Sequence, residues 1–183
     1  SQFSVFSSRC MTAPGLETRP MPGGGWLLAG AALCGGRAYA LLADFFAQTA
    51  RMMGMDTNAP YAAMEGLLKS ADRPEDVPTV LPLFEGTRQD STQTGSITGL
   101  TAENFTPLHL IYGMMDGMAH ELHQMYQAYR AAGGTAKKLI GSGGGLRNNR
   151  FLCESFSRVF DSAITLSDGR EEAACGAALY AAD

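Results

Sequence analysis

The sequence is short of basic residues. Its 14 Lys and Arg are outnumbered by 18 Asp and Glu, which leaves a formal net charge of −4, and no basic stripe runs along the chain. Nucleic acids and anionic lipid surfaces are held mainly by clustered positive charge. We therefore expect no nucleic-acid partner and no membrane partner, and we favour a small molecule or another protein.

Cysteine is also sparse, and none of the 4 cysteines belongs to a C-x-x-C pair. This spacing excludes zinc-ribbon and thioredoxin-like sites. Scattered thiols in a chain large enough to build a core without disulfides are typical of a reducing compartment, so we predict a cytoplasmic protein. The cysteines are Cys10, Cys34, Cys153 and Cys175.

Long uninterrupted apolar runs are missing as well. The most apolar stretch, residues 24–43, carries Gly30, Gly35 and Gly36 in its middle and many weakly apolar alanines. It predicts a buried strand, a turn and a helix rather than a membrane span. No charged and then apolar leader opens the sequence. Ser1 stands directly before a strand-like run, and we expect the chain to be a piece of a longer protein.

What the chain does contain is enough apolar sequence for about one domain. Of its 183 residues, 45% are hydrophobic and 17% are charged, which suits a globular core. Period-two and period-3.6 patterns alternate along the chain, which predicts an α/β domain with mixed strand pairing. The predicted strands are 2–6, 26–29, 79–84, 138–140 and 163–166, the predicted helices 35–53, 60–70, 107–132, 149–160 and 171–182, and the predicted connections 12–25, 73–78 (an exposed linker) and 85–98.

Caps mark the ends of these helices. Asn58 and Thr106 are expected as N-caps of the helices that begin with Pro60 and Pro107. Asn148 is expected to cap the predicted helix 149–160. Gly54 and Gly133 are expected to end the helices that precede them.

A glycine run, residues 141–145, lies between a predicted strand and a predicted helix. Free N–H groups and the helix dipole favour anionic or polar ligands at such a turn, although a plain tight turn explains it equally well. A phosphate-cradling G-x-x-x-x-G-K-[ST] string is absent, and a dinucleotide G-x-G-x-x-G fails because Leu146 replaces the third glycine. An ATP site remains, in which Gly143–Gly145 meet the nucleoside and Asn148 or Asn149 reaches it from the next helix.

Other residues with potential chemistry have simpler interpretations. His120 and His123 share a helical face, but no third ligand is evident, so we predict no metal site. Cys34 could be acidified at a helix N-terminus, but a buried and inert thiol is favoured. Gly176 inside the last helix predicts close packing against a neighbour. The methionines are most simply core filling: Met52, Met53, Met55, Met114, Met115 and Met118.

Several motifs, in the right order, resemble those of the FGGY carbohydrate kinases over nearly the whole chain. Residues 95–100 and 109–116 resemble the second family signature, with Gly113 where the family usually has Ala or Ser. Residues 81–88 resemble its L-P-x-x-x-G-E-R loop, with Thr87 in place of Glu. Residues 143–149 resemble its G-G-(A/G)-x-x-(N/S) turn, and residues 172–178 its closing E-x-A-x-G-A-A helix. Residues 17–20 and 30–36 are most similar to the sedoheptulokinase branch.

This resemblance implies a ribonuclease-H-like (actin-like ATPase) fold, with residues 1–183 as the C-terminal, ATP-binding domain of a two-domain sugar kinase. It implies ATP and Mg²⁺ as cofactors and a ketose, such as sedoheptulose, or a related sugar or polyol as substrate. Gly144 and Asn148 would contact the adenine or ribose, with Gly143 and Gly145 in the same turn, and Gly30 and Cys34 would lie near the α- and β-phosphates. The catalytic Asp and the Mg²⁺-facing carboxylate would lie in the missing N-terminal domain, so no catalytic residue is assigned in this chain.

Two function classes stay open. One is the kinase domain, inactive on its own. The other is a non-catalytic nucleotide-binding or sensing domain of the same fold, and a dinucleotide-binding domain is a weaker third. An Asp shortly before a Gly-Thr hairpin upstream of Ser1 would favour the kinase. The chain is also expected to expose an apolar surface that the missing lobe covers, and therefore to self-associate as a homodimer.

Overall fold

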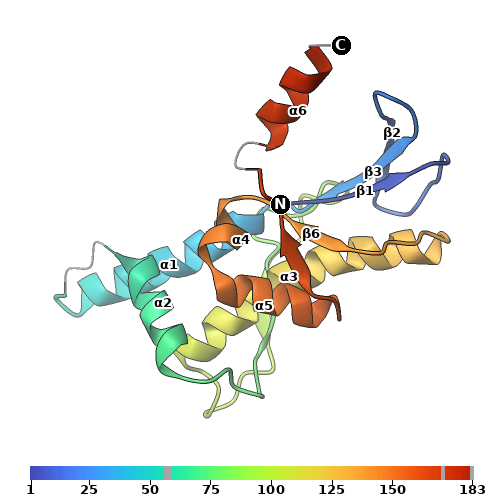
Figure 1. The fold of residues 1–183 in the computed structure, drawn as a ribbon. Coiled ribbons are helices and arrows are strands. Elements are labelled where there is room, and N and C mark those ends of the chain that lie inside the picture. The colour runs from blue at the N-terminus through green and yellow to red at the C-terminus, as the bar shows by residue number, and fades with distance from the viewer. Residues whose placement is uncertain (56–58, 170–171, 182–183) are drawn as a thin grey trace. The chain divides into compact units, whose positions relative to one another are not determined.

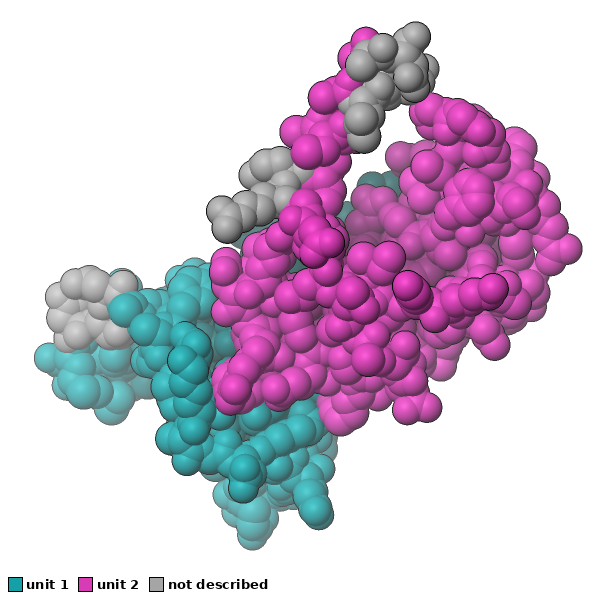
Figure 2. Space-filling model, in the orientation of Figure 1, with its two compact units in different colours: residues 1, 31–122 teal, residues 2–30, 123–183 magenta. Residues whose placement is uncertain are grey.

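The computed structural model describes residues 1–55, 59–169 and 172–181, and Figure 1 shows its elements in chain order. The chain divides into two units, coloured separately in Figure 2. Unit 1 comprises residues 1 and 31–122, and unit 2 comprises residues 2–30 and 123–183. The predicted N-cap Asn58 lies outside the described residues, as do parts of the expected last helix.

The N-terminal strands form one three-stranded sheet of order β1-β3-β2, from β1 (Gln2–Ser7), β3 (Trp26–Ala31) and β2 (Glu17–Pro20). β2 pairs antiparallel with β3, with Glu17 opposite Ala29. The prediction of a loop over residues 12–25 is therefore wrong at β2. Residues 17–20 have little strand character of their own, and their register against β3 across the glycine turn decides their conformation.

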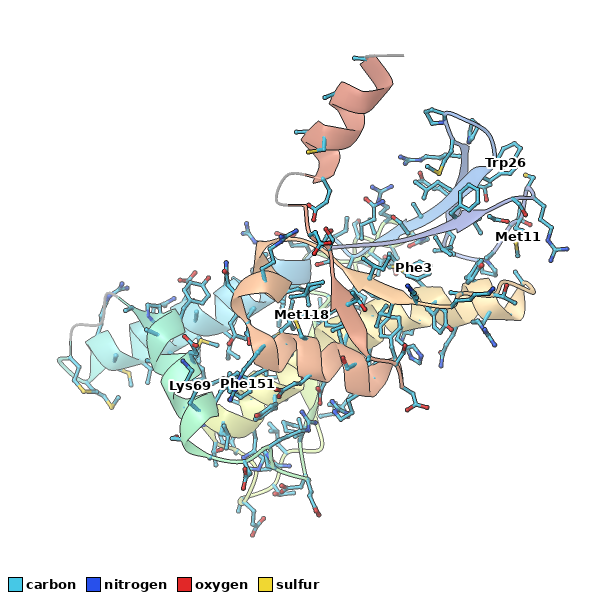
Figure 3. All side chains as sticks on the ribbon, in the orientation of Figure 1. Phe3, Met11, Trp26, Lys69, Met118 and Phe151 are labelled. Atoms are coloured by element: carbon cyan, nitrogen blue, oxygen red, sulfur yellow. The ribbon has the colours of Figure 1, made fainter. Side chains whose placement is uncertain are left out.

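The core of unit 2 lies under this sheet. Leu28 and Tyr129 are almost fully buried and pack together with Ala13. Phe3 on β1, labelled in Figure 3, packs against the long helix α3 (Pro107–Ala131), with its ring centroid 6.3 Å from that of Tyr126. The strand predicted at 2–6 and the strand–turn–helix predicted at 24–43 are both confirmed.

Unit 1 is mainly helical. It contains α1 (Gly35–Met52), α2 (Pro60–Ser70), the first part of α3 (Pro107–Ala131), and a short antiparallel pair of β4 (Thr79–Leu81) with β5 (Ser96–Thr98). The N–H of Gly54 donates to the carbonyl of Arg51 at a φ of 74°, so this glycine ends α1 as predicted. β5 falls inside a predicted loop, because three residues carry too weak a pattern without their partner strand.

Two glycines let β4 approach α3 closely. A Cβ built on Gly117 would lie 2.3 Å from the carbonyl oxygen of Val80, and one on Gly113 would lie 2.8 Å from that of Pro78. Both positions therefore exclude any side chain unless the backbone moves. This contact explains why Gly113 departs from the Ala or Ser that the resembling motif usually has.

The linker predicted as exposed over residues 73–78 is held to unit 1. Arg73 makes two hydrogen bonds to the carboxylate of Asp116, at 2.6 and 3.3 Å, and its guanidinium lies 4.9 Å from the ring centre of Tyr112. The side chain of Asn104 is buried and donates to the carbonyls of Asp76 and Gly99. The linker is thus an ordered connection.

The two methionine groups behave differently. Met114, Met115 and Met118 on α3 are buried as predicted. Met52 and Met53, at the end of α1, are 81% and 58% exposed, and Met55 is exposed too, so the expectation of core filling is wrong for them. Composition alone does not distinguish a buried methionine from one at an exposed helix end, because burial depends on which other element packs against the residue.

The second half of unit 2 contains β6 (Leu139–Gly141), α4 (Gly144–Asn148), α5 (Arg150–Val159), β7 (Ile164–Leu166) and α6 (Glu172–Ala181). β6 and β7 pair in parallel, which confirms mixed strand pairing. Asn149, and not Asn148, caps α5 by accepting the N–H of Leu152 at 3.1 Å. No described atom lies within 4 Å of a Cβ built on Gly176, so the expected close packing is not found.

No helix in the described part of the chain combines the length and the apolar character that crossing a membrane requires.

Candidate nucleotide site

The glycine turn follows β6 at the carboxyl end of the parallel pair. The N–H of Ser167, just after β7, donates to the carbonyl of Gly141 at 2.9 Å, so both strands end together. Gly143 has φ 98° and ψ 157°, a conformation available essentially only to glycine. Ligands of open α/β sheets bind at the carboxyl ends of strands. The turn therefore lies where a ligand of this sheet would be expected.

The residues after this bend leave an open surface. A Cβ on Gly144 would meet only the amide nitrogen of Asn148, at 3.8 Å, and one on Gly145 only Leu152, at 3.9 Å. These positions are exposed, and α4 has no buried residue. The structure thus brings the predicted Gly143, Gly144, Gly145 and Asn148 together on one helical turn. Open space and bare backbone are compatible with a flat ring lying on this turn.

Arg147 connects α4 to the segment before α6. Its guanidinium donates to the carbonyl of Gly169 and the carboxylate of Glu172, and more weakly, at 3.5 Å, to the hydroxyl of Ser167. The pKa of the Glu172 carboxyl is lowered, chiefly by the hydrogen bond from Ser167 and further by Arg147. Sequence reasoning did not identify this network, although its Arg and Glu stand in two of the quoted motifs.

Gly30 and Cys34 are both buried. A Cβ on Gly30 would lie 2.7 Å from Leu16 and from the sulfur of Met125, so packing within unit 2 requires a glycine there. In unit 1, Cys34 is 2% exposed at the start of α1, and burial first, then the charge of Glu85, raises the pKa of its thiol. This agrees with the inert interpretation of Cys34.

The loop that follows β4 is fixed to the start of α1. Arg37 pairs with Glu85 at 2.8 Å, and the nearby backbone of Phe84 offsets part of the rise that burial causes in the pKa of the Cys34 thiol. Within the loop, Thr87 N–H donates to the carbonyl of Asp90 at 2.9 Å. The L-P-x-x-x-G loop and the Gly-Gly helix start, which are far apart in sequence, therefore meet inside unit 1.

The polar residues of the second signature are used in structural bonds. His109 contacts Thr106 through Nδ1, at 2.7 Å, and Asp76 through Nε2, at 3.1 Å, and Asp116 holds Arg73. The amide of His109 and the N–H of Leu110 both bond to Thr106, which is the predicted cap. These bonds fix the start of α3.

The two histidines of α3 differ in environment. His120 is exposed, whereas His123 packs edge-on against Phe160, with ring centroids 4.9 Å apart. Among the described residues, no group of three or more His, Cys, Asp or Glu side chains could hold a metal ion. We assign the His123 ring to packing within unit 2.

The sequence matches a known family over most of its length. The model of the C-terminal domain of the FGGY family of carbohydrate kinases matches residues 7–182. The chain is also 27% identical, over 93 residues, to the xylulose kinase of Bacillus subtilis (strain 168). That alignment covers 51% of this chain and 18% of the relative.

Solved structures show the same fold. The xylulose kinase from Rhodospirillum rubrum aligns with a TM-score of 0.74 at 24% identity, over 90% of this chain and 32% of that chain. The Plasmodium falciparum glycerol kinase with ADP aligns with a TM-score of 0.72 at 17% identity, over 97% and 35%. Gluconate kinase from Lactobacillus acidophilus aligns with a TM-score of 0.71 at 18% identity, over 93% and 34%. The fold is therefore the ribonuclease-H-like (actin-like ATPase) mixed α/β fold, and the chain spans about a third of these solved chains.

Proposed function

Because the chain belongs to the FGGY family of carbohydrate kinases, matching its C-terminal domain, we propose that it supplies the nucleotide-binding half of an ATP-dependent sugar kinase. The observation that carries this proposal is the open glycine turn at the carboxyl end of β6 and β7, with Gly144 and Asn148 on one exposed face. Residues 1–183 are then the ATP-binding domain, and the sugar-binding domain lies elsewhere in the full-length protein.

In this proposal, the γ-phosphoryl group of ATP passes to a sugar hydroxyl whose proton goes to an Asp of the other domain. Gly144 and Asn148 hold the nucleoside, with Gly143 and Gly145 shaping the turn. Gly30 and Cys34 contribute near the α- and β-phosphates through their main chain, since both side-chain positions are buried. Mg²⁺ would neutralise the phosphates, and its protein ligands belong to the missing domain.

For the substrate we propose a ketose or a related sugar or polyol. Residues 30–36 are similar to the sedoheptulokinase branch, which favours sedoheptulose, whereas relatives named xylulose kinase favour a pentulose. A phosphorylation screen of the full-length protein over pentuloses, hexuloses, heptuloses and polyols tests this. ADP release that depends on one of these sugars supports the proposed kinase activity. If the protein binds ATP but turns it over with no compound of the panel, a nucleotide-sensing domain is supported instead. We also propose a cytoplasmic location, because all 4 cysteines are free thiols.

The purified 183-residue chain is expected to show no sugar-dependent ATPase or kinase activity. The reason is that the base and the metal-facing carboxylate are assigned to the other domain. A coupled ADP-release assay over the sugar panel measures this, with the full-length protein as the positive control. If the isolated chain turned over ATP in a sugar-dependent way, the assignment of these catalytic groups to the other domain would be wrong.

The isolated chain is also expected to self-associate through α1. Leu41, Phe45 and Met52 recur on one face of this helix and are 37%, 55% and 81% exposed. In the full-length protein, we propose that the other lobe covers such surface; without it, a second copy buries the stripe. Light scattering at micromolar concentration should show a dimer, and Phe45→Glu should shift it to monomer. A wild-type monomer that binds no hydrophobic dye would contradict this expectation.

A further inference from the structure

The helix that carries the glycine turn has few anchors of its own. α4 contains only 5 residues, none of them buried, and its N-cap, Gly143, has no side chain to cap it. A single helical turn of this length is unstable in water unless tertiary contacts hold it. Its position in unit 2 therefore depends on the few contacts that its side chains make.

One of these contacts joins three chain segments. Arg147 bonds to Ser167, Gly169 and Glu172, and the hydroxyl of Ser167 also donates to the Glu172 carboxylate. The side chains of Arg147 and Glu172 are 24% and 37% exposed, so the pair is partly shielded from water. Ser167 is itself bonded to the end of β6 through its backbone. The network thus links the start of α6, the end of β7 and the glycine turn.

We infer that Arg147 is a positioning residue for nucleotide binding, and that it holds the bare peptide of Gly144 at the distance from β6 that a nucleoside requires. This inference rests on the proposed function. Gly144 and Arg147 are three residues apart, which is about one helical turn, so fixing the guanidinium fixes the glycine above it. All three acceptors face one guanidinium nitrogen, Nη2, whose direction is fixed by the planar delocalised group, whereas an ammonium on a flexible stem has no such fixed direction.

A second contact holds α4 at Leu146. The thiol of Cys153 donates to the carbonyl of Leu146 at 3.1 Å, and the Leu146 side chain packs 2.9 Å from the place that a Cβ of Gly141 would take. This anchor holds the backbone of α4 independently of the guanidinium. Loss of Arg147 alone should therefore misplace the glycine surface without unfolding the unit.

The test compares Arg147→Met, Arg147→Lys and Glu172→Gln in the full-length protein. For Arg147→Met we expect the KM for ATP to rise about tenfold, with kcat and the KM for the sugar changed less than about twofold. Arg147→Lys should restore part of the loss, and Glu172→Gln should show a smaller rise in the same parameter. Calorimetric titration with ADP should show the same order. Arg130→Met, at an exposed arginine of α3 in the same unit, is the matched control and should behave as wild type.

The outcomes separate the two proposals. A wild-type protein that neither binds nor uses ATP contradicts the proposed function. A wild-type protein that binds ATP, with an unchanged KM for ATP in Arg147→Met, overturns the inference alone. If Arg147→Met lowers the melting temperature strongly, the inference is tested with the milder variant Glu172→Gln. An equal rise in the KM for ATP and the KM for the sugar in that variant would mean that the network has only a structural role, and would overturn the inference.

Discussion

Gly144→Val in the full-length protein is expected to raise the KM for ATP by about two orders of magnitude while leaving the fold intact. The Cβ of a new residue at this position meets only the Asn148 amide, at 3.8 Å, so the substitution creates no clash inside the protein. The branched side chain instead occupies the exposed face on which we place the nucleoside. Displacing a bound group by about 1 Å is enough to cost about 10²-fold.

The control for this variant is Gly66→Val. Gly66 lies on α2, and a Cβ there meets no described atom within 4 Å, so both substitutions place the same side chain on an open helical glycine. Steady-state kinetics and the melting temperature are measured for both proteins. If Gly144→Val is folded and binds ATP as well as Gly66→Val does, the turn is only structural and the nucleoside lies elsewhere.

Gly117→Val is expected to have the largest effect on stability and to prevent folding of unit 1. The new Cβ would lie 2.3 Å from the carbonyl oxygen of Val80 and 3.3 Å from Pro82, so β4 would have to leave α3. Overpacking in a core costs about 1–3 kcal/mol or more even where side chains can yield, and here the obstacle is backbone. Against a total stability of about 5–15 kcal/mol, this is a severe loss.

A graded series makes this prediction quantitative. Gly117→Ala should lose about 3 kcal/mol, and Gly113→Ala less, because its nearest obstacle is at 2.8 Å. Gly66→Ala should gain about 0.5–1 kcal/mol, since it only removes the helix penalty of glycine. Urea denaturation measures the free energy of unfolding of all three variants, provided that their m-values are equal. A Gly117→Ala protein as stable as Gly66→Ala would show that β4 does not approach α3 as described.

Much of this fold could be predicted from local sequence. Strands 2–7 and 26–31 and the helices beginning at Gly35 and Pro107 carry strong periodicity and marked ends, and they were predicted within a few residues. Their apolar residues recur over enough positions for the period of a strand or a helix to be recognised. The family motifs likewise located the glycine turn that the structure presents on an open face.

Other features were missed for identifiable reasons. The strands at 17–20 and 96–98 are 4 and 3 residues long, so their sequences show no usable pattern until a partner strand is present. The cap of α5 was assigned one residue early, because Asn148 and Asn149 are chemically identical in sequence. Met52 was assigned to the core from its residue type alone, but it lies exposed at the end of α1.

The sequence by itself determined the mixed α/β class, the order of the main helices and the place of the glycine turn, because these depend on neighbours within a few residues. Tertiary structure alone decided that Gly30, Gly113 and Gly117 are required by close approach. It also decided that Arg147 joins three segments of unit 2. Those contacts join residues that are far apart in the chain, and no local pattern encodes how closely two backbones approach or which acceptors a guanidinium reaches.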